Sequence, residues 1–281
     1  MKGGFILING KFYRENEPVF SGNDIPRFNN GTIESFRTED NIVMFAEANY
    51  NYLIDSLHSI DLQTPNDWTL PRFTKDVSRL LNKNHLFLAA RVVIRFYPGT
   101  DGTDYLLTAE ELPRGFYPVN DTGLLIDFYE DGFKSPTSHF AFEPANRFLW
   151  ANARRVANAL SRHNLILLTN DGWACETIGG SFGYIKDGIA IFPSRRLQGY
   201  RPPIMAVVME CARQCNMRIV EKIEISRDDL LNADELFIID NCLGIQLVLG
   251  LGNERYYTQD TTSLALKLNE LAKTVHLPGK S

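Results

Sequence analysis

Segments with strand character and segments with helix character are mixed along this 281-residue chain, with no regular strand–helix–strand order. The pair Asn9-Gly10, between two alternating apolar runs, is typical of a β-hairpin. Tyr50, Leu53 and Leu57 recur at helical spacing and predict an amphipathic helix in the segment AEANYNYLIDSLHSIDL. An irregular mixture of this kind favours α+β domains over a parallel sheet built from βαβ units.

The same patterns predict the remaining elements and a division into two domains. Helices are predicted over residues 72–82, 147–162, 204–215, 226–233 and 263–275, and strands within 32–45, 85–99, 124–132, 165–192, 217–225 and 235–252. Prolines and glycines gather in ELPRGFYPVNDTG, which is typical of a connection between domains. We therefore expect a smaller N-terminal α+β domain at 1–112, a linker at 113–123 and a larger C-terminal α+β domain at 124–281.

The helix predicted near the middle of the chain follows a Glu-Pro pair in the segment HFAFEPANRFLWANARR. Pro144 suits a first helical turn, where its missing N–H would have no partner. Leu149, Ala153 and Leu160 lie at three-four spacing and are expected to form the apolar face. Glu143 directly precedes the proline, and the helix pattern alone assigns no role to it.

Composition excludes several classes of function. The net charge is −5 and the pI is about 5.6, and no basic run could displace counterions from nucleic-acid phosphates. No apolar run approaches the roughly 18 residues of a membrane span, and the start MKGGFILINGKF lacks the features of a signal peptide. We expect a cytoplasmic protein that binds neither nucleic acid nor membranes.

Two further motifs do not carry chemistry on their own. Cys211 and Cys215 are four residues apart, but no histidine or second cysteine pair accompanies them, so buried small side chains are expected and a metal site is not. The segment GGSFG lacks the pattern of a phosphate-binding loop and is expected to be a tight strand connection.

Several segments, taken in order, carry a resemblance that covers nearly the whole chain. They are INGKF, FNNGTIESFRTEDNIVMFAEANYNYL, SPTSHFAFEPANRFLWANARR, LILLTNDGWACETIGGSFGYIKDGIAIFP and ADELFIIDNCLGIQLV. Together they resemble the class IV aminotransferases, the fold-type IV enzymes of pyridoxal phosphate (PLP), which include branched-chain and D-amino-acid aminotransferases and 4-amino-4-deoxychorismate lyase. The resemblance implies a two-domain α+β fold with a cleft between the domains, a homodimer, and PLP as the cofactor.

The lysine that the resemblance implies is replaced in this sequence. The family's K-x-x-N pattern places Glu143 at the lysine position when it is anchored on Asn146, and Pro144 when it is anchored on Ser138. Neither residue can form the imine with PLP, and a glutamate could serve only as a general acid or base. Lys134 lies nine residues before Glu143 in a Gly-Phe-Lys-Ser-Pro turn, and we do not expect it to reach the same point. The sequence leaves open the alternative that a lysine from elsewhere, such as Lys134 or Lys186, enters the site.

Other cofactor positions also depart from the family pattern. Tyr52 occupies the position where the resemblance implies an arginine that binds the cofactor phosphate. Asn49 occupies the position of the neighbouring histidine. Ile204 lies near the position of a phosphate-binding threonine. Pro202 and Pro203 remove two backbone N–H groups from the same loop, which a bound phosphate would need.

One cofactor position is retained. Glu176 matches the glutamate that, by resemblance, pairs with the pyridine nitrogen and keeps it protonated. Arg147, beside the lysine position, could supply a new contact to an anion. The remaining residues that the resemblance places at the cofactor are Gly179, Asn241 and Cys242, and those in the loop near the substrate are Phe28, Arg195, Arg196 and Arg201.

Two hypotheses follow. In the first, the protein is a PLP-dependent transaminase or an aminodeoxychorismate-lyase-like enzyme that uses an unconventional base such as Glu143. In the second, it is a relative without the lysine that keeps the fold and the dimer but binds another small anionic ligand in the cleft between domains, with or without chemistry. The replaced residues favour the second hypothesis, whereas the resemblance alone favours the first.

Overall fold

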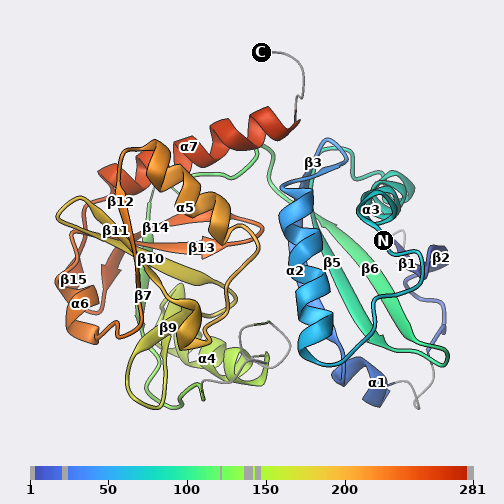
Figure 1. The fold of residues 1–281 in the computed structure, drawn as a ribbon, viewed down its shortest axis with the longest axis horizontal. Helices are drawn as coiled ribbons and strands as arrows, with labels where there is room; N and C mark the ends of the chain where they lie inside the picture. Colours follow the sequence, from blue (N-terminus) through green and yellow to red (C-terminus); the bar gives the residue numbers. More distant parts are fainter. Residues whose placement is uncertain (1–3, 21–24, 121, 136–141, 143–146, 277–281) are drawn as a thin grey trace. The chain divides into compact units, whose positions relative to one another are not determined.

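The computed structural model describes residues 4–20, 25–120, 122–135, 142 and 147–276 and contains two compact units. Unit 1 comprises Met1–Phe116 and Ala272–Ser281, and unit 2 comprises Tyr117–Leu271. The predicted linker, residues 113–123, contains the division between the two units. Figure 1 shows the elements of each.

Unit 1 is built on an antiparallel sheet, which has six strands among the described residues. Their spatial order is β2 (Lys11–Arg14), β1 (Phe5–Ile8), β6 (Thr103–Glu111), β5 (Ala89–Pro98), β3 (Thr32–Glu39) and β4 (Ile42–Val43). The predicted hairpin is confirmed, because β1 and β2 pair around Asn9 and Gly10, whose φ angles of 48° and 79° suit a tight turn.

Three helices of unit 1 precede or connect these strands: α1 (Ile25–Asn29), α2 (Ala46–Ser59) and α3 (Leu70–Asn84). Leu53 and Leu57 of α2 and Phe73 of α3 pack with Phe36 of the sheet in one buried cluster. In Figure 1, α2 runs along the strands β5 and β6. Helix α3 begins earlier than predicted, because the Thr69 side chain accepts a hydrogen bond from the N–H of Arg72 and caps the first turn.

Unit 2 contains a mixed sheet, which has nine strands in the part of the chain that the structure describes. The main path is β12 (Arg218–Lys222), β11 (Ile189–Pro193), β10 (Ser181–Lys186), β13 (Glu235–Asp240), β14 (Gly244–Leu251), β7 (Leu124–Phe128), β8 (Asn164–Leu168) and β9 (Ala174–Thr177), and β15 (Glu254–Arg255) pairs with β14. Strands β14, β7 and β8 are parallel to one another, whereas β8 and β9 are antiparallel. The carboxyl end of β8 therefore lies beside the start of β9.

The described helices that begin in unit 2 are α4 (Arg147–Ala159), η4 (Arg195–Leu197), α5 (Met205–Gln214), α6 (Arg227–Leu231) and α7 (Gln259–His276). Of these, η4 is a 3₁₀ turn, and α7 ends in residues that belong to unit 1. The apolar face predicted for α4 was partly wrong. Trp150, Ala153 and Ala157 are its buried residues, while Leu160 lies beyond the helix and is 50% exposed. Ala153 is therefore buried as predicted, whereas Trp150 and Ala157 are buried in place of Leu149 and Leu160, and Trp150 points into the interior of unit 2.

Candidate functional site

Glu176 is the centre of the candidate site, a carboxylate that is fully buried on β9. Its Oε1 accepts a hydrogen bond of 2.8 Å from Nε1 of Trp150. Its Oε2 accepts one of 2.5 Å from the backbone N–H of Tyr200 and is also in contact with Nζ of Lys134. A buried charge needs a counter-ion and hydrogen bonds to be stable, and these three donors supply both.

The position of Lys134 corrects an expectation drawn from the sequence. We did not expect this lysine to reach the site, but its amine forms an ion pair with Glu176 and both side chains are 0% exposed. The physical reason is strand pairing. The N–H of Lys134 donates to the carbonyl of Leu168 and Lys134 bridges Thr169 in parallel, so the chain after β7 rejoins β8 at its carboxyl end, next to β9.

Trp150 contacts one oxygen of the carboxylate, and Tyr200 contacts the same oxygen as Lys134. The rings of Trp150 and Tyr200 pack edge to face with centroids 5.1 Å apart, and Tyr200 is 2% exposed. Gly199 allows the backbone to come this close, because a Cβ at this position would lie 2.1 Å from the carbonyl oxygen of Cys175. The glycine is therefore needed for space, and it brings the N–H of Tyr200 to Glu176.

Cys175, next to Glu176 in sequence, does not provide a nucleophile. Burial, together with the neighbouring charge of Glu176, raises the pKa of its thiol above the ordinary value. The thiol donates to the carbonyl of Leu167 at 3.3 Å. Because the thiolate is the reactive form, a thiol held protonated in this way is inert.

The loop before α5 uses its backbone groups internally. Tyr200 donates to Glu176, Ile204 donates to Oδ1 of Asn241 at 3.2 Å, and Met205 donates to the carbonyl of Pro202 at 2.9 Å. Asn241 lies in the turn between β13 and β14, so its hydrogen bond with Ile204 ties this turn to the loop. The N–H groups of Tyr200, Ile204 and Met205 are thus used within the protein.

The arginines of the predicted substrate loop have different surroundings. Arg201 is largely buried, forms a 2.8 Å ion pair with Glu221 and donates to the carbonyl of Pro193. Burial lowers the pKa of Arg201 from its ordinary value, and the charge of Arg195 acts in the same direction. Arg195 and Arg196 are exposed on η4, and Arg147 is exposed at the start of α4. Arg201 therefore belongs to the framework, and Arg195 and Arg196 face solvent.

The other expected site residues are distributed over both units. Gly179 lies in the turn between β9 and β10 with a φ of 73°, and an added Cβ there would meet no neighbour. Cys242 is buried, and its N–H donates to Asp240 at 2.7 Å. In unit 1, Tyr52 lies on α2, and Phe28 lies on α1 with its ring 4.6 Å from that of Tyr97.

Glu143, the residue expected at the lysine position, lies outside the residues that the structure describes. Among the described residues, no group of three His, Cys, Asp or Glu side chains is placed to hold a metal ion. No described helix is both long and apolar enough to cross a membrane.

The sequence matches the family model of amino-transferase class IV over residues 31–250. A search of curated protein sequences finds no match. The family match extends through most of both units and includes Lys134 and Glu176.

Solved structures of similar fold are branched-chain aminotransferases. That of Thermoproteus uzoniensis with norvaline has a TM-score of 0.84 at 17% identity and covers 99% of this chain and 96% of its own. That of Thermobaculum terrenum in its PLP form has a TM-score of 0.83 at 14% identity, with 98% and 94% covered. The Escherichia coli structure has a TM-score of 0.80 at 16% identity, with 94% and 92% covered. At these identities the likeness establishes the fold, and the expected α+β fold of the fold-type IV enzymes is confirmed.

Proposed function

This chain belongs to the amino-transferase class IV family, and from that premise we propose that it is a member with a degenerate cofactor site, which binds a small anionic molecule without holding PLP by the family's contacts. The ordinary cofactor of such a protein would supply an electron sink for reactions of amino acids. In this chain, the groups that would hold that cofactor are replaced or are bonded within the protein.

A single observation carries the proposal: both carboxylate oxygens of Glu176 are already used by Lys134, Trp150 and Tyr200. In the arrangement implied by the resemblance, the cofactor ring separates the lysine from the glutamate, because the aldehyde carbon and the ring nitrogen lie on opposite sides of the ring. Here the amine and the carboxylate are in direct contact. The described residues therefore do not fit PLP in that arrangement.

The phosphate side of the site supports the same conclusion. Pro202 and Pro203 have no N–H to donate, and the N–H groups of Tyr200, Ile204 and Met205 are bonded within the protein. A phosphate that takes these three N–H groups would have to break their bonds. An uncompensated donor or acceptor in a buried site costs about 1–3 kcal/mol, which opposes binding through these groups.

The exposed arginines of η4 are the basis for proposing an anionic ligand. Arg195 and Arg196 follow Ser194, which caps the turn, and neither has the ion pair that holds Arg201. A guanidinium is well suited to bind a carboxylate or phosphate through two parallel hydrogen bonds. We further propose a homodimer, as in the family resemblance; a monomer in size-exclusion chromatography with light scattering at micromolar concentration would contradict it.

The test is chemical trapping. Full-length protein is incubated with PLP, its visible absorbance spectrum is recorded, and the mixture is reduced with borohydride, digested and mapped by mass spectrometry. We expect no lasting imine band and no stoichiometric reduced adduct on any lysine. The Lys186→Ala variant, which changes a surface lysine of unit 2, serves as a matched control for non-specific labelling.

A second candidate is a PLP enzyme in which Lys134 replaces the family lysine, and the delivery of its amine to Glu176 favours this alternative. This alternative requires the ion pair between Lys134 and Glu176 to break when PLP binds. In the trapping experiment, a stoichiometric adduct that maps to Lys134 and is absent from Lys134→Met would establish this alternative and overturn the degenerate site.

A further inference from the structure

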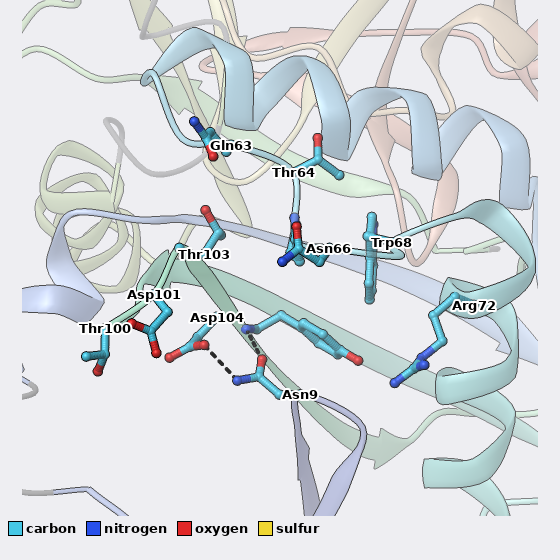
Figure 2. A pocket seen from close by; sticks show the side chains of 13 residues that line it. Asn9, Gln63, Thr64, Asn66, Trp68, Arg72, Thr100, Asp101, Thr103 and Asp104 are labelled. Atoms are coloured by element: carbon cyan, nitrogen blue, oxygen red, sulfur yellow. Dashed lines mark hydrogen bonds between the residues drawn. The ribbon is translucent and has the colours of Figure 1, made fainter.

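A cavity of about 370 Å³ lies within unit 1 and is made entirely of residues of that unit. Its walls come from the β1–β2 turn, the connection between α2 and α3, the β5–β6 turn and the first turn of α3, as Figure 2 shows. Its size falls within the range of cavities that hold small molecules, at the lower end. Neither the family match nor the proposed function assigns a role to it.

The cavity has a prearranged wall. Asn9 donates from Nδ2 to Asp104 at 2.7 Å and accepts from the backbone N–H of Tyr105 at 2.9 Å, and both bonds are drawn in Figure 2. Behind them, Tyr105 and Arg72 donate to the same oxygen of the fully buried Asp76, at 2.6 and 2.8 Å. Side chains fixed by the protein need not be ordered by a ligand, which lowers the entropic cost of binding.

Trp68, which lines the cavity, carries an unsatisfied donor. It is only 4% exposed, and its indole N–H has no hydrogen-bond partner among the residues that the structure describes. Contacts with Tyr105, Phe96 and Phe73, at centroid distances of 4.5, 5.3 and 5.8 Å, fix the ring. This N–H has almost no accessible surface, so Trp68 meets a ligand in the cavity through its ring and not through its N–H.

The charges of the lining restrict the class of ligand. The cavity presents one cation, Arg72, which is already paired with Asp76, and two carboxylates, Asp101 and Asp104. An anion would therefore be repelled. The other polar lining residues are neutral amides and hydroxyls: Asn9, Gln63, Thr64, Asn66, Thr100 and Thr103. A lining that contains both acceptors and donors suits a ligand whose groups can donate and accept at once, as hydroxyl groups do.

We propose that this cavity binds a neutral polyol about the size of one sugar ring. Its hydroxyl groups donate to Asp101 and Asp104, while the amides and threonines complete the remaining hydrogen bonds. This inference is independent of the proposed function, because it concerns a different part of the chain and a ligand of different charge.

The test uses full-length protein and saturation-transfer NMR with D-glucose, D-galactose, D-ribose and myo-inositol at millimolar concentrations, followed by titration of any compound that binds. Inorganic phosphate and putrescine are included as a charged anion and a charged cation. The variant is Asp101→Asn, which removes the charge of an exposed carboxylate and replaces one of its two acceptor oxygens with an NH2 group. Asp67→Asn is the matched control, an exposed aspartate beside Trp68 that does not line the cavity.

We expect saturable binding of at least one neutral polyol, weakened about fivefold or more by Asp101→Asn, as the loss of one hydrogen bond predicts, and unchanged by Asp67→Asn. The proposal is overturned if no polyol binds, if Asp101→Asn leaves binding unchanged, or if only phosphate or putrescine binds.

Discussion

The side-chain amine of Lys134 contacts the carboxylate of Glu176 in the interior of unit 2, although the two residues are 42 positions apart in the sequence. Neither side chain is exposed to solvent. The pair lies where strands β8 and β9 meet, and it fixes how the segment after β7 returns to the sheet. Both the proposed function and its main alternative depend on whether this contact persists when PLP is offered.

Breaking the pair from one side should be more damaging than removing it. Lys134→Met or Glu176→Gln alone leaves a buried charge without its partner, and we expect a loss of about 3–5 kcal/mol in the free energy of unfolding. The double variant, which removes both charges, should lose less than the sum of the single losses. Urea denaturation followed by tryptophan fluorescence measures this. Additive losses would show that the ion pair does not couple the two residues.

Gly199→Ala should destabilise unit 2 more than Gly188→Ala. A Cβ at Gly199 would lie 2.1 Å from the backbone oxygen of Cys175, so we expect a loss of at least about 3 kcal/mol as the chain shifts. Gly188 has a φ of 73° but no neighbouring atom within 4 Å, and alanine there should cost only about 1–2 kcal/mol. Denaturation of both variants tests this order, and equal losses would contradict the close approach at Gly199.

The acid stability of unit 1 should depend on Asp76. Burial alone would raise the pKa of this carboxyl, but hydrogen bonds from Tyr105, Arg72 and Arg79 outweigh burial and lower it below the ordinary value of 3.8. Because the pKa is lower in the folded state, the stabilisation is present above about pH 4 and is lost as the pH falls through the folded-state value.

Asp76→Asn should therefore lower the free energy of unfolding by about 2–3 kcal/mol at neutral pH and flatten its decline in acid. Thermal unfolding between about pH 2 and pH 6 provides the measurement. The exposed Asp61→Asn serves as a control. An equally steep decline in Asp76→Asn and the unaltered protein would show that other groups set the acid stability.

Substitutions of the arginines in and near η4 should have two different effects, one on stability and one on anion binding. Arg201→Met removes the partially buried ion pair with Glu221 and should lower the melting temperature. The double variant Arg195→Ala/Arg196→Ala should leave the melting temperature unchanged and abolish any stabilisation by succinate or inorganic phosphate. Differential scanning fluorimetry with and without each anion distinguishes the two. Stabilisation by the anions that survives the double variant would place the anion site elsewhere.

Local sequence patterns were sufficient for most elements of the fold. The turn between β3 and β4 follows from Asp40 and Asn41, which adopt φ angles of 46° and 66° that short polar side chains tolerate. Helix α7 begins four residues earlier than predicted, at Gln259, because the carboxylate of Glu235 accepts from the N–H groups of Asp260 and Thr261. Because Glu235 lies on β13, distant in the sequence, the residues around the start of α7 carry no local signal of this cap.

The site could be predicted only in part for the same reason. Glu176 was located by its place in a motif, and the prolines of the following loop were visible in the sequence. The position of Lys134 depends on its pairing with β8, and the donor at Tyr200 is a backbone group, which carries no residue type to recognise. The unsatisfied N–H of Trp68 likewise becomes visible only when its surroundings are known.

The three donors around Glu176 have a consequence for the protein in the cell. An enzyme that leaves such a carboxylate to its cofactor gains stability when the cofactor binds, so its folded fraction and its resistance to degradation depend on cofactor supply. Here the chain itself provides every hydrogen bond to the buried charge. Its abundance should therefore stay constant when cells are starved of vitamin B6, while the abundance of relatives that need the cofactor to stay folded declines.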